Sequence, residues 1–475
     1  MAARGRHGDL ADLLALGLVA VAAIGLGALI ALSLTLTGGL IVGGLVIAVL
    51  FTAPISAFAG INVVMLAIVP IVALTPSTSS LIDVVGGPAR LTLVIVLILM
   101  GRLLIVRRDP QFPPLVLAAV SLAVLTLLLE TTVGLAADAS PSTLDDLSRD
   151  ALFPLAALTG ALSTTMGGAR AYHWLGWVAF AVFAASIVYW ASVAHGFGGS
   201  ALDGFFAPVR SLHDYHDRTA FPFANDSPNG SATSYVLLMA LICPVLWTWA
   251  QHRVLGAAIA VLGVVAVLTT QSRTGLLALA AAIAAIIVMT RPPNQRLPAV
   301  ALAVVVVGGF LALSPRVLPT QRQLSADAPT LLARKSLWTT AVQAFGEAPL
   351  LGHGHRFAVT ERFVEPAAIS NRPANATTPA RQSIAGTQSE YLAQLVDGGV
   401  LGGIALGAVG GLMCFAAYRL KGRERAAFRV AMYAVVAAAA VAMISTQITL
   451  APATQSIVWL AFGMTAGLWA RPDAR

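Results

Sequence analysis

Long apolar runs, separated by short polar turns, dominate the chain from end to end. A helix needs about 20 apolar residues to cross the hydrocarbon layer of a membrane, and about fourteen runs approach that length. They lie at about 11–32, 36–54, 60–76, 87–106, 112–136, 151–168, 174–194, 234–250, 254–270, 275–290, 297–314, 390–418, 428–449 and 455–470. The first run follows two arginines, as in a signal peptide, but it is longer and leads straight into further runs. The pattern predicts an all-α, polytopic integral membrane protein.

The basic residues in the polar turns predict the orientation of these spans, because cytoplasmic loops carry an excess of Lys and Arg. With the N-terminus in the cytoplasm, the inner turns contain Arg107, Arg108, Arg170, Arg253, Arg291, Arg296, Arg419, Lys421, Arg423, Arg425, Arg429, Arg471 and Arg475. An even number of spans then places both termini in the cytoplasm. The chain divides into spans at 1–194, a first outward loop at 195–233, spans at 234–315, a large outward loop at 316–389 and spans at 390–475.

The large outward loop is too long to be a simple connection, since loops beyond about 12–15 residues are usually functional or disordered. Its segment 333–346 has the spacing of an amphipathic helix, and aromatic residues alternate with turn residues around it. We therefore expect a partly helical cap on the outer face of the membrane.

Composition narrows the functional class. Of the 475 residues, 58% are hydrophobic and only 11% are charged, against about 25% charged in soluble domains. This excludes a soluble enzyme and a disordered chain. The net charge of +8 reflects the cytoplasmic turns and a small outward arginine cluster. A nucleic-acid partner is excluded because no soluble basic face is predicted. Cys243 and Cys414 lie in apolar runs, where small core residues are expected.

Polar groups gather in the outward segments and in one tight turn. The first loop contains Arg210, His213, Asp214, His216, Asp217 and Arg218 before an aromatic stretch and Asn229. The turn Gln271–Gly275 joins two apolar runs with hardly any room for a loop. A charged residue such as Arg273 at the membrane border is a site candidate. The alternative is an arginine that only ends a helix and reaches toward water. Four consecutive polar residues favour a site.

The second loop carries two further polar blocks. Arg334 and Trp338 precede Pro349–Phe357, which includes Gly352, His353, Gly354 and His355. Gln388, Ser389, Glu390, Tyr391 and Leu392 then enter a helix that continues through Asp397, Gly398 and Gly399. Glycines here allow close approach of the backbone at a turn or against a neighbouring helix.

Taken in order, these blocks resemble the O-antigen ligase and Wzy-type O-antigen polymerase family of bacterial membrane glycosyltransferases, which are GT-C-like. Four motifs match the family in the same order, and they spread over about residues 200–405. They are Arg218…Phe223…Pro228-Asn229, then Ser272–Gly275, then Arg334…Trp338…Pro349–Phe357, and finally Gln388–Leu392…Asp397–Gly399…Gly402. Two departures stand out. Gln388 occupies the place of a family histidine thought to serve catalysis, and an amide cannot accept a proton at neutral pH. The spacing from Arg218 to Asn229 is longer than usual, so Arg210 is an alternative to Arg218.

The resemblance implies transfer of a glycan from an undecaprenyl-pyrophosphate carrier to an acceptor sugar hydroxyl, on the outward face of the bacterial inner membrane. Arginine's planar fork suits phosphate oxygens, so Arg218 and Arg273 are expected to hold the pyrophosphate. Glu390 is the candidate base, with His353 and His355 as runners-up, while a structural role at the helix N-terminus is the alternative for Glu390. The expected catalytic residues are Arg218, Arg273, Gln388 and Glu390, and the expected substrate-binding residues are Arg210, Asn229, Ser272, Arg334, His353, His355 and Tyr391.

Cofactors and partners follow from the same resemblance. No cofactor is expected, because arginines would stabilise the leaving group. His213-x-x-His216 and His353-x-His355 could suggest zinc, but no third ligand cluster accompanies them, and no metal is expected. The expected partners are a lipid-linked oligosaccharide donor, membrane lipid, and an acceptor that is a glycan, the lipid A core or another sugar.

Two other classes fit a chain with many spans. A polysaccharide-lipid flippase or another transporter would concentrate charged residues or broken helices near the middle of the membrane. A membrane scaffold would not require the Ser-Arg-Thr-Gly turn. Here the polar residues gather in the outward segments, which favours the glycosyltransferase. Polymerase and ligase stay open, and the altered histidine position favours a polymerase or a divergent ligase.

Overall fold

The computed structural model describes residues 54–73, 112–136, 144–195, 199, 222–223, 228–292, 294–302, 305, 329–355, 389–422, 425–447 and 451–470. Every regular element in this part of the chain is a helix. Two short 3-10 helices, η1 (Ile55–Ala57) and η2 (Ala250–His252), each lead directly into an α-helix. The α-helices are α3 (Phe58–Ala73), α6 (Pro114–Ala136), α7 (Leu144–Gly167), α8 (Arg170–His195), α10 (Pro228–Thr248), α11 (Arg253–Thr269), α12 (Arg273–Thr290), α14 (Pro329–Glu347), α18 (Glu390–Arg419), α19 (Ala426–Ser445) and α20 (Pro452–Ala470).

Among the described residues, seven helices are long and apolar enough to cross a membrane, namely α6, α8, α10, α11, α12, α18 and α19. This confirms the all-α, polytopic architecture, whereas the number of fourteen spans stays a prediction. The predicted runs at 11–32, 36–54 and 87–106 lie outside the described residues. Where both can be compared, helix boundaries differ by up to seven residues, and the largest differences are at the starts of α7 and α10, which begin in polar sequence before the apolar run.

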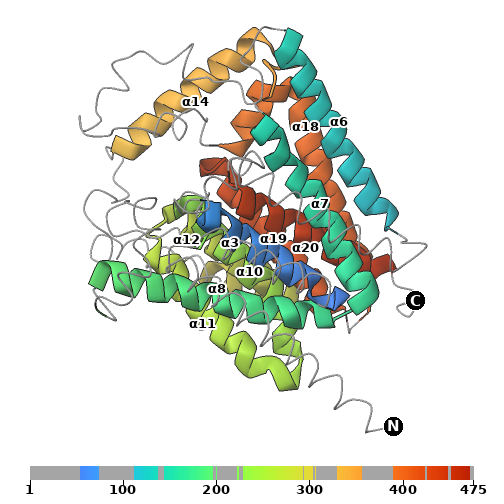
Figure 1. Ribbon diagram of the computed structural model, residues 1–475, viewed down its shortest axis with the longest axis vertical. Coiled ribbons are helices and arrows are strands. Elements are labelled where there is room, and N and C mark those ends of the chain that lie inside the picture. The colour runs from blue at the N-terminus through green and yellow to red at the C-terminus, as the bar shows by residue number, and fades with distance from the viewer. Residues whose placement is uncertain are drawn as a thin grey trace, which may run out of the picture.

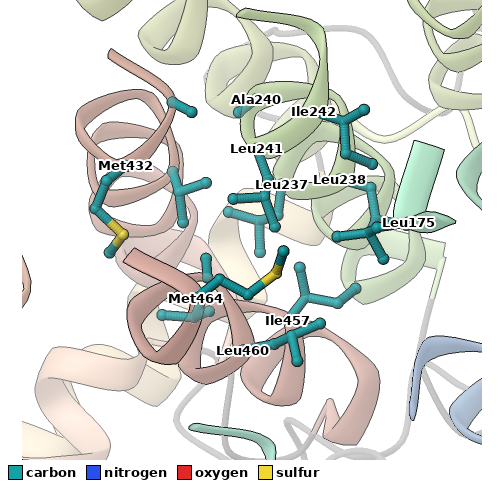
Figure 2. Close-up of a cluster of buried hydrophobic side chains, with 14 of the residues drawn as sticks. Leu175, Leu237, Leu238, Ala240, Leu241, Ile242, Met432, Ile457, Leu460 and Met464 are labelled. Carbon is teal, nitrogen blue, oxygen red and sulfur yellow. The ribbon is translucent and has the colours of Figure 1, made fainter. Parts of the chain in front are cut away.

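Helix α20 occupies the centre of the bundle and is buried along nearly its whole length. It packs closely against α7, because Gly160 lies against the backbone of Leu460 and Gly463 lies against that of Ala157. Small residues at such crossings bring helices into close van der Waals contact, which replaces the hydrophobic driving force that lipid does not provide. Apolar side chains from α8, α10, α19 and α20 fill the space around this axis (Figure 2).

Helix α14 lies along one edge of the molecule, next to the start of α18, while α6 runs beside α18 (Figure 1). The buried residues of α14, Leu337, Ala341 and Ala344, recur at helical spacing, and the last two pack against Val396 of α18. Lys335 faces outward. The amphipathic helix predicted at 333–346 is thus confirmed, with four extra residues at its start and one at its end.

A kink interrupts α18 at Gly399, whose φ of 62° and ψ of −152° are not helical. The segment that follows α14 satisfies the backbone groups that the kink releases. His353 N–H donates to the Val396 carbonyl at 2.8 Å, Gly354 N–H donates to the Asp397 carbonyl at 2.9 Å, and Val400 N–H donates to the Pro349 carbonyl at 2.8 Å. An interrupted helix at membrane depth is tolerated where protein supplies such partners.

Several helices meet at one end of the bundle, which we call the polar end. Helices α10, α12, α18 and α20 begin there, and α11 and α19 end there. Side-chain hydrogen bonds join them: Ser234 of α10 bonds to Thr454 of α20 at 2.9 Å, and Thr274 of α12 bonds to Ser445 of α19 at 2.7 Å. The fold therefore brings sequence-distant polar residues together at this end of the bundle.

Candidate functional site

The turn between α11 and α12, residues 271–275, presents Arg273 at the polar end; we call it the arginine turn. Gln271 has a φ of 50°, the left-handed conformation that commonly ends a helix, and it is the sole non-glycine residue with positive φ in the described part of the chain. This one residue reverses the chain without a longer loop. The structure therefore explains how the tight turn that the sequence indicates is made.

Ser272 fixes the geometry of this turn. Its hydroxyl caps α12 by accepting a hydrogen bond from Gly275 N–H at 3.0 Å, and it donates to Asn229 Oδ1 at 2.8 Å. The Ser272 side chain is fully buried. Gly275 packs so closely against Ala232 of α10 that a Cβ would collide. Asn229 and Ser272, both predicted site residues, are therefore in direct contact and hold the starts of α10 and α12 together.

Arg273 is the first residue of α12 and is partly buried. The N-terminus of a helix carries a partial positive charge, which favours anions and disfavours a cation. A guanidinium and a helix N-terminus at one point together make a strongly anion-attracting place. This position suits the binding of a phosphate-bearing ligand.

The start of α18 carries Glu390, which is only 3% exposed. Its Oε1 accepts a hydrogen bond from Gln394 Nε2 at 3.1 Å, one helical turn further on. The neighbouring Ser389 hydroxyl donates to the Met443 carbonyl at 3.3 Å, and the Tyr391 hydroxyl donates to the Ala440 carbonyl at 3.0 Å. Glu390 is thus held at the polar end by two anchors on α19.

The last turns of α19 connect Glu390 with Arg273. Residues 440 and 443 bond to the start of α18, and Ser445 bonds to Thr274, the neighbour of Arg273. Five residues of helix cover only about 8 Å. The structure therefore brings Arg273, Asn229, Ser272, Glu390 and Tyr391 to one end of the bundle.

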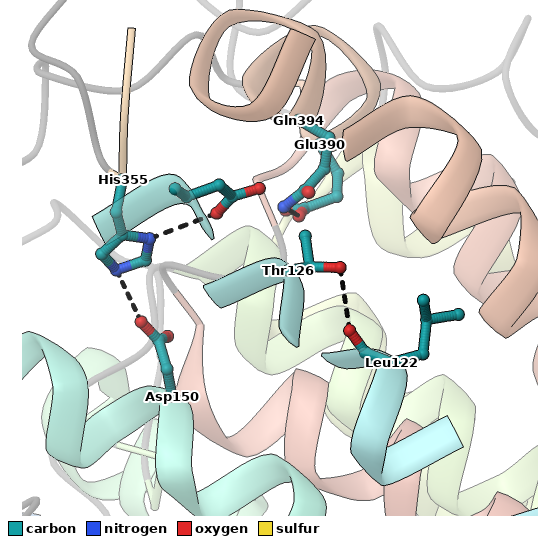
Figure 3. A network of polar contacts seen from close by, with 7 residues as sticks. Leu122, Thr126, Asp150, His355, Glu390 and Gln394 are labelled. Atoms are coloured by element: carbon teal, nitrogen blue, oxygen red, sulfur yellow. Dashed lines mark hydrogen bonds and ion pairs between the residues drawn. The ribbon is translucent and has the colours of Figure 1, made fainter. Parts of the chain in front are cut away.

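A second group of titratable residues lies between α6, α7 and the segment that follows α14. His355 Nε2 lies 2.7 Å from Asp150 Oδ2, and His355 Nδ1 lies 3.5 Å from Glu130 Oε2 (Figure 3). Together with Asp397, these residues form what we call the carboxylate–histidine cluster, and the three acidic residues are each less than 8% exposed. Figure 3 also shows Glu390 and Gln394 in the same view, on the neighbouring α18.

The electrostatics of this cluster favour a protonated imidazole. Burial of the His355 ring acts to lower its pKa, but contacts with Asp150 and Glu130 and the charge of Asp397 outweigh that effect and raise the pKa to about 10. His355 is therefore cationic at neutral pH and compensates buried carboxylates. In that state it cannot accept a proton from a substrate.

Close backbone contacts hold the same region. Gly354, with a φ of 100°, lies so close to the backbone of Gly134 in α6 that a side chain at Gly354 would collide with that helix. His355 N–H donates to the Glu130 carbonyl at 3.0 Å. The Gly-x-Gly-x spacing of the sequence thus allows a loop to lie flat between two helices.

The remaining predicted residues lie on or near α14. His353 Nε2 is 2.7 Å from the Ala344 carbonyl, so this nitrogen carries the proton and the ring is tied to the end of α14. Arg334 is partly buried on α14, and its burial lowers the guanidinium pKa.

Arg210, Arg218 and Gln388 lie outside the described residues. Sequence inspection missed Asp150, because it stands in an acidic stretch typical of an ordinary helix start, and no local signal points to its partner some 200 residues later. In the part of the chain that the structure describes, no three His, Cys, Asp or Glu side chains are grouped so as to hold a metal ion.

Comparison with known families identifies residues 258–407 as a match to the O-antigen ligase family model, Wzy_C. No curated protein matches the chain. The matched segment contains the arginine turn, α14, the loop at 349–355 and the first half of α18, and it ends before α19. The resemblance indicated by the sequence motifs is confirmed over this segment. With its membrane-spanning helices, the chain is a multi-pass membrane protein with a glycan-processing domain of the ligase or polymerase kind.

Proposed function

We propose that this membrane protein with an O-antigen ligase domain is a glycosyltransferase that transfers a glycan from an undecaprenyl-pyrophosphate carrier to an acceptor sugar hydroxyl. The reaction takes place at the polar end of the bundle, which faces outward from the bacterial inner membrane, with both termini in the cytoplasm. One observation carries the proposal: Arg273 stands at the N-terminus of α12, buttressed by the Ser272–Asn229 hydrogen bond, at the end of the bundle where Glu390 is also held.

In this mechanism the acceptor oxygen attacks the anomeric carbon, and the bond from that carbon to the pyrophosphate oxygen breaks. The pyrophosphate leaves with the electron pair, so negative charge grows on its oxygens. Arg273 and the N-terminus of α12 stabilise that charge, since both are fixed before the reaction begins. Arg218 is proposed as the second arginine, and no cofactor is needed for this step.

The acceptor hydroxyl loses its proton during the attack, and Glu390 is proposed to receive it. Its carboxylate is buried at the start of α18, and Gln394 orients it through a hydrogen bond at 3.1 Å. His355 is less suited, because contacts with Asp150 and Glu130 keep it protonated. A carboxylate base is consistent with Gln388 in the place of the family histidine, because Gln388 can bind a substrate but cannot accept its proton.

The decisive experiment incubates the purified protein with an undecaprenyl-pyrophosphate-linked oligosaccharide, alone and with lipid A core as a separate acceptor, and follows product length. A ladder of longer lipid-linked glycans identifies a polymerase, and transfer to the lipid A core identifies a ligase. Absence of any transfer, with movement of labelled lipid-linked glycan across proteoliposomes, would identify a flippase and contradict the proposal. The altered histidine position favours a polymerase or a divergent ligase.

A further inference from the structure

The turn between α19 and α20 buries an unusual number of uncharged polar side chains. Thr446 is 7% exposed, Gln447 is 9% exposed and Ser456 is 1% exposed, and Gln455 is partly buried in the first turn of α20. We call these four residues the neutral turn. It carries no charged side chain at its described positions, 446–447 and 451–456.

Each residue of the neutral turn has a buried polar atom without a hydrogen-bond partner among the described residues: Thr446 Oγ1, Gln447 Oε1, Gln455 Oε1 and Ser456 Oγ. Buried polar atoms are nearly always paired, and each exception needs an explanation. These four unpaired atoms belong to residues 446–456, where the chain passes from α19 to α20. A ligand that supplies hydroxyl groups would pair them.

Contacts place the neutral turn beside the arginine turn and the start of α18. Ser445, directly before Thr446, bonds to Thr274 next to Arg273. Thr454, directly before Gln455, donates to the Gly230 carbonyl at 2.9 Å, one residue from Asn229. Helices α19 and α20 run through the middle of the bundle in Figure 1, so their joint end borders both α10 and α12.

The chemistry of the neutral turn differs from that of the arginine turn. Side-chain amides and hydroxyls both donate and accept hydrogen bonds, as sugar hydroxyls do, and they carry no charge that would attract phosphate. We propose that Gln447 and Gln455 bind hydroxyl groups of the donor sugar next to the pyrophosphate. This inference rests on the proposed function, and it assigns a role to residues outside the segment that matches the family model.

We assign Gln447 and Gln455 to the donor sugar and not to the acceptor because the contacts of α19 place Gln447 near Arg273. Ser445 contacts Thr274, whose neighbour Arg273 would hold the pyrophosphate, and Gln447 follows Ser445 by two residues. The sugar bonded to the pyrophosphate must lie next to that pair. Discrimination between sugars would then come from amides that lose a partner when a hydroxyl is absent or inverted.

The test uses two lipids of equal charge, of which only one carries a sugar: the methyl ester of undecaprenyl pyrophosphate and undecaprenyl-pyrophosphate N-acetylglucosamine. Binding of each to the full-length protein in nanodiscs is measured by thermophoresis, and the ratio of the two dissociation constants reports the sugar contribution. The variants are Gln447→Met and Gln455→Met, which keep side-chain length and remove the amide. Gln251→Met is the matched control, because Gln251 is an exposed glutamine at the opposite end of α10.

We expect wild-type protein to prefer the sugar-bearing lipid, and each variant to reduce that preference about 3- to 10-fold, the loss typical of one neutral hydrogen bond. The control leaves the ratio unchanged. Thermal stability of both variants stays equal or rises, since each loses an unpaired buried polar atom; a purely structural amide would lower it. Arg273→Ala weakens both lipids alike and preserves the ratio.

Failure of this inference is separable from failure of the proposed function. An unchanged ratio in both glutamine variants, or equal binding of the two lipids by wild type, overturns the inference even when Arg273→Ala weakens both lipids. A variant that raises only the KM for the acceptor overturns the assignment to the donor sugar. If Arg273→Ala weakens neither lipid, the proposed function fails, while the ratio still reports on Gln447 and Gln455.

Discussion

The arginine turn and the carboxylate–histidine cluster both place charge inside a membrane protein, yet they treat it in opposite ways. Arg273 stands at a helix N-terminus directly after Ser272, which bonds to Asn229, and its charge adds to the partial positive charge of the helix end. His355 lies between Asp150 and Glu130, where its charge is neutralised. The first arrangement places a guanidinium and a helix N-terminus together, which favours an anion, whereas the second pairs a cation with carboxylates of the protein.

This difference separates residues suited to chemistry from residues suited to architecture. A cation at a helix N-terminus adds to the positive charge of the helix end, and an anionic ligand bound there compensates for both charges. Such a position is therefore suited to a functional site. A charge that the fold compensates in full holds elements together, here α6, α7 and the loop after α14. The carboxylates of the cluster are each less than 8% exposed, whereas Arg273 is only partly buried, so the more deeply buried charges are those that lie beside a charge of opposite sign.

Replacement of Arg273 with Ala is expected to have the largest effect on transfer activity. Transfer activity falls about 10²- to 10³-fold, the usual loss when one fixed donor to a developing anion is removed. The activity is expressed per folded molecule, so the thermal midpoint of the variant is determined beside its activity. Activity assays with lipid-linked donor and a thermal melt measure both. Arg273→Lys is the matched control and keeps part of the activity; full activity of Arg273→Ala would contradict the role.

Glu390→Gln tests whether Glu390, at the start of α18, accepts the proton of the acceptor hydroxyl. The amide keeps the shape of the side chain but cannot accept a proton, so turnover drops about 100-fold and loses its acidic limb in the pH–rate profile. KM for the donor changes little. Asp150→Asn serves as the comparison, since it alters a carboxylate of the cluster. If Glu390→Gln only lowers stability and leaves turnover per folded molecule intact, Glu390 is a structural residue.

His355→Gln is expected to act on stability rather than on turnover. Removal of one partner from a buried ion pair costs about 3–5 kcal/mol, because uncompensated carboxylates remain. Turnover per folded molecule stays within a few-fold of wild type. Addition of Asp150→Asn to His355→Gln recovers part of the loss, and a double-mutant cycle of unfolding free energies measures this coupling. If the losses of unfolding free energy in His355→Gln and Asp150→Asn are strictly additive, the contact between the two side chains does not contribute to stability.

The pH dependence of the same contact has a definite sign. Because the folded pKa of His355, about 10, lies above the ordinary value of 6.5, its contribution is fully present below about pH 6.5 and is lost as pH rises toward 10. The stability advantage of wild type over His355→Gln therefore shrinks steadily from pH 6.5 to 10.5. Thermal melts of both proteins across this range measure the difference, and a constant difference would refute a protonated imidazole.

Ser272→Ala gives the smallest effect. It removes the cap of α12 and the link to Asn229, which costs about 1–2 kcal/mol of stability. Activity falls about 10-fold through a misplaced Arg273, with kcat affected more than the KM for the acceptor. Thr290→Ala, at the opposite end of α12, is the control and changes neither. An activity loss as large as that of Arg273→Ala would instead indicate that the hydroxyl contacts the substrate.

The helices could be predicted from local sequence, because the cost of unpaired backbone groups in lipid makes a long apolar run a helix wherever it stands. It also singled out the arginine turn, since four polar residues between two apolar runs have no other place than the membrane border. The amphipathic pattern of 333–346 similarly predicted α14, whose apolar positions are those that pack on α18.

The contacts between polar residues, by contrast, depend on the packing of the helices. The contact between His355 and Asp150 joins positions about 200 apart, and the hydrogen bond between Ser234 and Thr454 joins positions 220 apart. Nothing in a local pattern encodes such pairs, because they depend on how whole helices cross. The same holds for the neutral turn: a Gln or Thr near the end of a span looks like an ordinary boundary residue, and its burial without a partner depends on helices that arrive from elsewhere in the chain.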